Sequence, residues 1–420
     1  MKYIEVEGGA CLQGTLSVQG SKNAALPMMA AALLTKQPVT LHDCPDIEDT
    51  RVMCELLKHM GVDVKQEGKT LHIHARSVRD SKLPYELVRK MRSSIMVMGA
   101  LLCRTGYAEM AFPGGCVIGA RPIDLHISGL RELGYEIEET ETALIGRYVP
   151  ELSSGVRQIH LNFPSVGATE NILMGAVHAG GRTVLTGAAC EPEVRELALM
   201  LQQMGARMEG IGSEKLCING TQILRGVERT VPKDRIVAGT YLVAAALTGG
   251  HVEIIGLESD DVEALLTVLK QMGCHIEIKE KPCRIILEAP KTLKAVDIHT
   301  APHPGFPTDM QAMIMVAMTQ AEGVSHIRET IFENRFRHVE ALRRMGAHID
   351  VRGDMAIVHG KTPLQADILC ATDLRAGAAM VLAGLCAKGK SQIEGLEHIE
   401  RGYENLVRDL TELGGKVSQQ

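Results

Sequence analysis

The chain has 420 residues, of which 45% are apolar and 23% are charged; this composition is ordinary for a globular protein, and the length exceeds one usual core. A formal net charge of −6 argues against a nucleic-acid or anionic-membrane surface. We therefore expect two globular domains.

Eleven cysteines are scattered along the chain without a CxxC pair, which predicts reduced thiols. The first residues, MKYIEVEGGACLQGTLSV, alternate like a strand and lack the apolar core of a signal peptide. No apolar run is long enough to span a membrane. These features predict a soluble, cytoplasmic protein that binds neither membranes nor nucleic acids.

After this strand, a helix of small apolar residues recurs six times, each time followed by a turn and a strand. Because these helices are apolar almost all round, we expect them to be buried. The six segments span residues 23–43, 92–112, 168–188, 238–258, 309–329 and 374–395.

A second helix follows each of these segments and is amphipathic, as in VEALRRM. Each ends in an apolar residue and a glycine, followed by an alternating strand, which predicts a left-handed C-cap. The glycines recur every 68 to 73 residues, at Gly61, Gly134, Gly205, Gly273, Gly346 and Gly414.

These two patterns predict six copies of one α/β unit. A solenoid is the alternative for any repeat, but solenoid periods are shorter and each copy here is nearly a complete layer. We therefore favour two closed three-unit domains. The expected N-terminal domain covers residues 21–229. The C-terminal domain covers 230–420 together with 1–20, whose first strand should pair there.

Several of the buried helices begin with a basic residue: Lys22, Arg92, Arg235 and Arg375. A cation at this position opposes the helix dipole, at a cost of about 0.3–1 kcal/mol when exposed. If the six helix starts converge, the bases and the free backbone N–H groups form an anion site. The alternative is that some of these bases pair with nearby carboxylates.

Residues 111–129, AFPGGCVIGARPIDLHISG, interrupt the repeat with a glycine-rich loop. A cysteine near an arginine, as Cys116 is near Arg121, can have a lowered pKa and act as a nucleophile or proton donor. Other cysteines, such as Cys103, Cys370 and Cys386, lie in apolar contexts and are interpreted as core residues.

The segment HTAPHPGFPTDMQA places Asp309 after a proline-rich loop and at the start of a buried helix. Asp309 is either a helix cap or a general base. His299 and His303 lack metal-type spacing, so no metal site is predicted. The chain has no P-loop, Rossmann glycine motif or GxSxG.

Three arginines occur at strand-to-helix connections of the C-terminal half: Arg335, Arg375 and Arg401. Each alone is typical of a surface salt bridge. Together with Lys22 and Arg121, they indicate a ligand that carries both a phosphate and a carboxylate, because arginine binds such anions bidentately.

Across essentially the whole chain, these motifs resemble the UDP-N-acetylglucosamine 1-carboxyvinyltransferase family, the enolpyruvyl transferases of peptidoglycan synthesis. The motifs are GSKNAALP, PGGCVIGARPIDLHISGL, SVGATENI, TAPHPGFPTDMQA, ENRF, ATDLRAG and HIERGYE. The resemblance implies a two-domain inside-out α/β barrel of six βαβαββ repeats, three per domain, with the ligands in a cleft that closes on the sugar nucleotide.

The resemblance also implies the reaction. The enolpyruvyl group of phosphoenolpyruvate moves to the 3-hydroxyl of UDP-N-acetylglucosamine, with release of phosphate and without metal or organic cofactor. Asp309 would take the hydroxyl proton, and Cys116 would protonate the methylene carbon and be alkylated by fosfomycin. We expect a monomer whose partners are these two small substrates.

The binding residues follow from the same resemblance. Phosphoenolpyruvate would be held by Lys22, Arg121, Arg335, Arg375 and Arg401. UDP-N-acetylglucosamine would be held by Asn23, Arg92, Arg121, Pro122, Ile123, Asp124, Leu125, Ser165, Val166, Gly167, Asp309 and Ile331. Lys22 and Arg401 would also assist catalysis.

The chain departs from this family pattern at Phe163, where some members carry lysine, and at Val237, where we expect glutamate.

Three alternative functions remain open. A shikimate-type synthase would not explain the Cys116 loop. An inactive paralogue would not explain the intact Lys22, Cys116, Asp309 and Arg401. An RNA-end-processing enzyme conflicts with the net acidity and the scarcity of aromatic residues.

Overall fold

The structure is a computed structural model that describes residues 2–114, 123–149, 155–178, 181–221, 223–281 and 283–420. The chain folds into two compact units. The C-terminal unit contains residues 2–19 and the described part of 233–420, and the N-terminal unit contains the described parts of 20–114 and 123–232. None of the helices in the described ranges has the length and apolar character needed to cross a bilayer.

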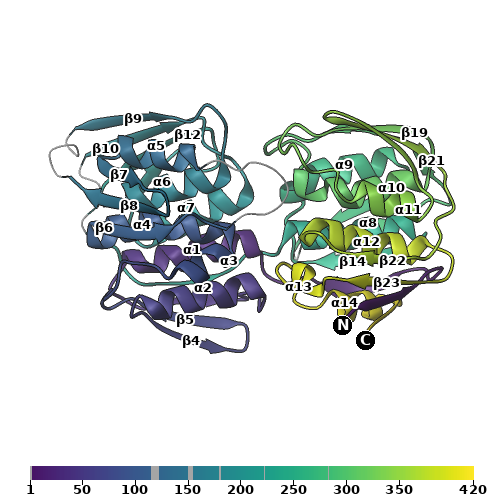
Figure 1. The fold of residues 1–420 in the computed structure, drawn as a ribbon, viewed down its shortest axis with the longest axis horizontal. Helices are drawn as coiled ribbons and strands as arrows, with labels where there is room; N and C mark the ends of the chain where they lie inside the picture. Colours follow the sequence, from purple (N-terminus) through teal and green to yellow (C-terminus); the bar gives the residue numbers. More distant parts are fainter. Residues whose placement is uncertain (1, 115–122, 150–154, 179–180, 222, 282) are drawn as a thin grey trace. The chain divides into compact units, whose positions relative to one another are not determined.

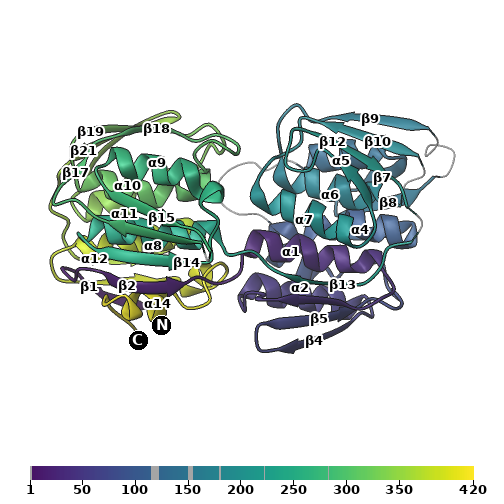
Figure 2. The same ribbon diagram turned by 180° about the vertical axis from the view of Figure 1, so that it is seen from behind.

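The N-terminal strands belong to the C-terminal unit, as the purple strands among the yellow and green elements show in Figures 1 and 2. The segment expected to form one strand forms two, β1 (Ile4–Glu7) and β2 (Gln13–Ser17). β1 pairs antiparallel with β23 and β24, while β2 pairs parallel with β14. The predicted pairing of the first strand with the C-terminal half is therefore confirmed.

Within the described residues, the strands of the C-terminal unit form three sheets. Their orders are β22-β23-β1-β24, β15-β16-β14-β2 and β17-β19-β21-β20, with β18 also paired to β19. The remaining strands of this unit are β14 (His251–Ile255), β15 (His275–Lys279), β16 (Arg284–Glu288), β17 (Leu293–Lys294), β18 (Asp297–His299), β19 (Ala321–Arg328), β20 (His348–Arg352), β21 (Met355–Gly360), β22 (Ile368–Cys370), β23 (Lys390–Glu394) and β24 (Lys416–Gln419).

The described strands of the N-terminal unit also form three sheets, in the orders β13-β3-β5-β4, β6-β8-β7 and β11-β12-β10-β9. These strands are β3 (Val39–His42), β4 (Asp63–Glu67), β5 (Thr70–His74), β6 (Tyr107–Ala111), β7 (Tyr135–Glu139), β8 (Ala143–Tyr148), β9 (Val156–His160), β10 (Arg182–Thr186), β11 (Arg207–Glu209), β12 (Lys215–Asn219) and β13 (Val227–Thr230).

The six small-residue helices are buried, as their all-round apolar sequences predict. Two of them begin with a 3-10 turn, η2 (Arg92–Ile95) before α4 and η5 (Thr308–Met310) before α10, and a third, η1 (Ala32–Leu34), follows α1. The buried helices are α1 (Lys22–Ala31), α4 (Met96–Thr105), α6 (Val166–Ala176), α8 (Arg235–Leu247), α10 (Gln311–Thr319) and α12 (Leu374–Cys386).

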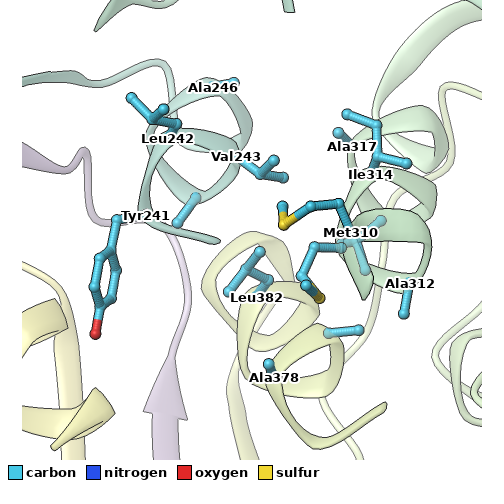
Figure 3. Close-up of a cluster of buried hydrophobic side chains, with 14 of the residues drawn as sticks. Tyr241, Leu242, Val243, Ala246, Met310, Ala312, Ile314, Ala317, Ala378 and Leu382 are labelled. Carbon is cyan, nitrogen blue, oxygen red and sulfur yellow. The ribbon is translucent and has the colours of Figure 1, made fainter. Parts of the chain in front are cut away.

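In the C-terminal unit, the helices α8, α10 and α12 pack on one another (Figure 3). Val243 and Leu382 point into the space between the helices, and alanines such as Ala378 fill the positions where the helices come close. Small side chains allow this approach without large aromatic anchors. The N-terminal unit has a separate core around α1, α4 and α6.

Amphipathic helices follow each buried one, at α2 (Glu48–His59), α5 (Asp124–Glu132), α7 (Pro192–Gln203), α9 (Glu263–Gln271), α11 (Val339–Arg344) and α14 (Leu406–Glu412). The six predicted glycines follow them with φ between +82° and +113°. After Gly205, for example, the Ala206 N–H donates to the Leu201 carbonyl at 2.9 Å, which is the long bond of a Schellman cap. The predicted C-caps are confirmed.

Three short helices complete the described elements: α3 (Tyr85–Lys90), η4 (Ser259–Val262) and α13 (Leu396–Ile399). The last of these ends directly before the turn that carries Arg401. Of the two positions that depart from the family pattern, Val237 is fully buried in α8, whereas Phe163 is exposed.

Candidate active site

Asp309 lies at the start of a buried helix, where its carboxylate binds two arginines. It sits inside η5, and the N-cap positions of η5 and α10 are Pro307 and Met310, so the helix-cap interpretation is wrong. Arg335 Nη2 donates to Asp309 Oδ1 at 2.6 Å, and Arg375 Nη2 donates to Oδ2 at 2.8 Å. Three of the predicted site residues, distant in the chain, therefore form one cluster.

Both arginines of this cluster are buried, each only 6% exposed. Arg335 also donates to the Thr308 carbonyl at 3.2 Å, and its guanidinium carbon lies over the Phe332 ring, 5.7 Å from the ring centroid. Burial by itself lowers the pKa of Arg375, but the charge of Asp309, followed by Tyr403 and Asp234, outweighs burial and raises it. The cluster therefore holds a planar carboxylate between two fixed guanidinium groups.

The starts of α8, η5–α10 and α12 lie close together. Arg375 in the first turn of α12 therefore interacts with Asp234 before α8 and with Asp309 in η5. Asp234 caps α8 by accepting from the N–H groups of Ile236 and Val237. Asp373 caps α12 in the same way. Aspartate is among the residues preferred at this position, because its side chain satisfies backbone N–H groups of the first turn.

Glu329 organises the loop that joins these elements. This side chain, 4% exposed, accepts hydrogen bonds from Thr300 Oγ1 at 2.9 Å and Thr308 Oγ1 at 3.0 Å. It also accepts from the backbone N–H of Ile331 at 2.9 Å and of Phe332 at 3.1 Å. Glu329 thereby ties the segment before Asp309 to the segment that contains Ile331.

A small, partly open pocket lies beside the proline-rich loop of the C-terminal unit. The start of α8, η4 and the loop residues 303–307 surround it. Arg235 and His303 line the pocket, as do Asp260, Asp261 and Glu263. Arg235, singled out as a basic helix start, thus borders an open space next to the loop that carries Asp309.

In the N-terminal unit, Lys22 is the first residue of α1, and its ammonium lies 3.3 Å from Asp49 Oδ2. Asp49 is buried in the first turn of α2. The alternative that some bases pair with carboxylates is therefore confirmed for Lys22, as it is for Arg375. Asn23 follows Lys22 in α1, and Arg92 is the first residue of η2.

The other predicted nucleotide-binding residues of this unit lie at two helix starts. Ile123 is the N-cap residue of α5, with Asp124 and Leu125 in the first turn. Ser165 caps α6 by accepting from the Ala168 N–H at 3.3 Å, and Val166 and Gly167 begin that helix.

A Cβ at position 167 would lie 3.1 Å from the His126 ring, a tight contact that a larger residue could make only if the ring shifted. His126 is buried and its Nδ1 lies 3.1 Å from Asn171 Nδ2. Asn171 also bonds the backbone of Ile95 and Gly99. These contacts tie α5 and α6 to the start of α4.

Cys116, Arg121 and Pro122 lie outside the described residues. Cys103 and Cys386 are half-buried, and burial raises the pKa of both thiols to about 12, so the core interpretation is supported only in part. It is wrong for Cys370, which is exposed because it ends the edge strand β22.

Sequence reasoning missed Glu329, Asp49 and Tyr403. The buried Tyr403 hydroxyl lies 2.8 Å from Thr240 Oγ1 and contributes to the charge environment of Arg375. In the sequence, Tyr403 stands only two residues after Arg401, and Glu329 stands where a strand ends. The position of Glu329 was the one available signal, because polar side chains at strand ends often build sites.

Comparison with known proteins assigns the family. The EPSP synthase (3-phosphoshikimate 1-carboxyvinyltransferase) family model matches residues 6–410. UDP-N-acetylglucosamine 1-carboxyvinyltransferase 1 of Caldanaerobacter subterraneus is 46% identical over 419 residues, covering 99% of each chain. The Magnetococcus marinus UDP-N-acetylglucosamine 1-carboxyvinyltransferase is 44% identical over 100% of this chain and 99% of its own.

Solved structures give the same result for the fold. The enolpyruvyl transferase NikO from Streptomyces tendae superposes with a TM-score of 0.89 at 25% identity, covering 100% of this chain and 99% of its own. EPSP synthase from Acinetobacter baumannii superposes with a TM-score of 0.77 at 20% identity and the same coverage, which concerns the fold alone. The chain therefore belongs to the EPSP synthase family and, within it, to the UDP-N-acetylglucosamine 1-carboxyvinyltransferases.

Proposed function

We propose that this chain transfers the enolpyruvyl group of phosphoenolpyruvate to the 3-hydroxyl of UDP-N-acetylglucosamine and releases phosphate, the first committed step of peptidoglycan synthesis. The observation that carries the proposal is the cluster in which the partly exposed Asp309 binds the buried Arg335 and Arg375. The relatives of 44–46% identity bear the name of this activity over the full chain length.

In the proposed reaction, the oxygen of the sugar 3-hydroxyl bonds to C2 of phosphoenolpyruvate while Asp309 removes the hydroxyl proton. Cys116 protonates the methylene carbon C3 to give a tetrahedral intermediate. C3 then loses a proton, the C2–O bond to phosphate breaks, and the enol ether forms. The two arginines favour the ionised Asp309, which is the form a general base needs.

Arg335 and Arg375 are proposed to bind the carboxylate of phosphoenolpyruvate. Their hydrogen bonds to Asp309 support this role, because a substrate carboxylate has the same shape and charge. A bound substrate would share or replace these contacts and release Asp309 toward the sugar hydroxyl. Lys22, Arg121 and Arg401 are proposed to hold the phosphate.

The sugar nucleotide is proposed to contact Asn23, Arg92, the segment 121–125, Ser165, Val166, Gly167 and the Ile331 backbone. Helix starts support this assignment, since α5 and α6 present N-terminal N–H groups to an anion.

We further propose an inside-out α/β barrel of three repeats in each domain, with domains at 21–229 and at 1–20 with 230–420. Three sheets in each unit support this arrangement, as do the mutual packing of α8, α10 and α12 and the packing of α4 on both α1 and α6. A cytoplasmic monomer that needs no metal or organic cofactor completes the proposal. The ten described cysteines, all free thiols, fit a reducing compartment.

The test is phosphate release from purified protein supplied with both substrates, and with each one alone. We expect release only when both are present, and a loss of about 10²–10⁴-fold in Asp309→Asn. Replacing the sugar nucleotide with 3-phosphoshikimate should give no release. If both substrates bind but no phosphate appears, the proposed activity is wrong.

Fosfomycin should label wild type and leave Cys116→Ser unlabelled.

A further inference from the structure

Three metal-ligating side chains lie on the outward face of the β20–β21 hairpin: His348, Asp350 and His359. Successive strand residues point to opposite faces, so His348 and Asp350 share one face while Ile349 between them is buried. His359 on β21 is directly opposite His348 in the strand register. The strand geometry therefore brings the three side chains together.

The distances between these groups are short. His359 Nε2 lies 3.3 Å from Asp350 Oδ2. The rings of His348 and His359 are stacked, with centroids 4.2 Å apart and an angle of 23° between their planes. The three ligand atoms all lie within 4.8 Å of one another. Two ligands of a tetrahedral zinc ion at its usual bond lengths are separated by about 3.4 Å, so the ligand atoms would have to move closer together on binding an ion.

From this geometry we propose that His348, Asp350 and His359 bind a divalent transition-metal ion of the zinc class. Two imidazoles and one carboxylate are the ligand types that zinc accepts in proteins, with water in the fourth position. A hard cation such as magnesium is excluded, because it prefers an octahedron of oxygen atoms.

The simpler interpretation is an ordinary ion pair between His359 and Asp350. Comparable pairs occur elsewhere on strands, such as His326 with Asp297 at 2.8 Å. Those pairs offer one imidazole and one carboxylate. Among the residues that the structure describes, only the β20–β21 hairpin brings a second imidazole to the same point. The third ligand separates a metal site from a surface salt bridge.

A bound ion would fasten β20 to β21 at their far end from the connecting turn. Because it binds only the folded hairpin, it would raise the stability of the chain with increasing ion concentration. The site is independent of the proposed reaction, which uses no metal.

The experiment is calorimetric titration of the full chain with Zn²⁺, paired with Co²⁺ absorbance. We expect one ion per chain at this site and a Co²⁺ spectrum without a thiolate charge-transfer band. The double variant His348→Gln/His359→Gln should lose this binding event, and Asp350→Asn should weaken it. Thermal unfolding without metal should stay as in wild type, because all three positions are on the outer face.

His275→Gln is the control, since His275 is an exposed strand histidine directly opposite Glu288. His251 flanks the same glutamate from β14, but among the described residues these three side chains do not lie within 4.8 Å of one another. The His275→Gln variant should bind Zn²⁺ as wild type does. The proposal is overturned if the double variant binds Zn²⁺ unchanged, if Co²⁺ reports thiolate ligands, or if His275→Gln loses the same event.

Discussion

Glu329 joins two segments of the candidate site, the one that leads to Asp309 and the one that contains Ile331. Its carboxylate accepts four hydrogen bonds, two from threonine hydroxyls and two from backbone N–H groups. A buried carboxylate so fully satisfied fixes its neighbours, because each donor would be left unpaired if it moved. Glu329 is therefore a positioning residue for Ile331 and for the segment that leads to Asp309.

Replacing this side chain separates positioning from stability. Glu329→Ala should destabilise the fold by about 1–3 kcal/mol, because it leaves buried donors unpaired. It should also raise the KM for UDP-N-acetylglucosamine more than it lowers kcat, since the Ile331 backbone loses its anchor. Glu329→Gln should recover much of the stability and of the wild-type KM, because the amide oxygen can replace Oε1.

Steady-state kinetics and thermal unfolding check this prediction. Glu322→Ala is the control, because Glu322 is exposed on β19, the strand that Glu329 directly follows. A Glu329→Ala variant with the KM of the control would show that Glu329 only stabilises the fold.

Glu170 gives the molecule a pH-sensitive stability. It is fully buried in α6, and neither carboxylate oxygen has a hydrogen-bond partner within the described ranges. Burial, followed by the charges of Glu193 and Glu191, raises its pKa well above the ordinary value. The unfolded chain releases this proton at lower pH, so stability falls as pH rises through and above the ordinary glutamate range.

Glu170→Gln should therefore unfold at a higher temperature than wild type at about pH 8, with the difference vanishing near pH 4. The amide stays neutral at both values. Thermal unfolding at several pH values measures the effect, with the exposed Glu136→Gln as control. An equal gain at both ends of the pH range would contradict the assigned cause.

At the scale of elements, the glycine that ends each amphipathic helix determines where the next strand begins. Gly205 has φ +113°, which L side chains rarely adopt. A Cβ there would meet only the Ile223 carbonyl, at 3.8 Å. Any cost of a side chain at this position is therefore a backbone cost, without a steric clash.

Gly205→Ala should destabilise the chain by about 1–2 kcal/mol because of this backbone strain. The melting temperature of its unit should fall by about 2–8 °C. Gln202→Ala, in the exposed last turn of α7, does not change the backbone conformation and should leave the melting temperature nearly unchanged. Equal melting temperatures for the two variants would exclude a conformational role for the glycine.

At the scale of the whole molecule, each unit has its own hydrophobic core. Leu382 is fully buried in the core of the C-terminal unit, and Leu173 in that of the N-terminal unit. Because packing is local, a cavity in one core removes contacts from that unit first. The two units should therefore differ in their response to such a cavity.

Leu382→Ala and Leu173→Ala should each cost about 2–5 kcal/mol and lower different components of the calorimetric transition. The exposed Val324→Ala and Ile223→Ala are the matched controls. A single transition displaced equally by both core variants would mean that the chain unfolds as one cooperative block.

The sequence by itself determined the features that depend on residues near one another in the chain. Helix periodicity predicted the buried and amphipathic helices, and glycine predicted their C-caps. Its family motifs named the candidate residues. It misjudged Cys370 and left open whether Asp309 caps a helix, because exposure and charge pairing depend on neighbours from elsewhere in the fold.

Only the tertiary structure decided which of these residues meet. Arg375 reaches Asp309 across 66 positions of sequence, and Thr300 reaches Glu329 across 29. His359 faces His348 only because two strands pair in one register. No local pattern specifies such contacts, since they arise when separate helices and strands bury their apolar faces together and bring polar side chains at their ends into reach.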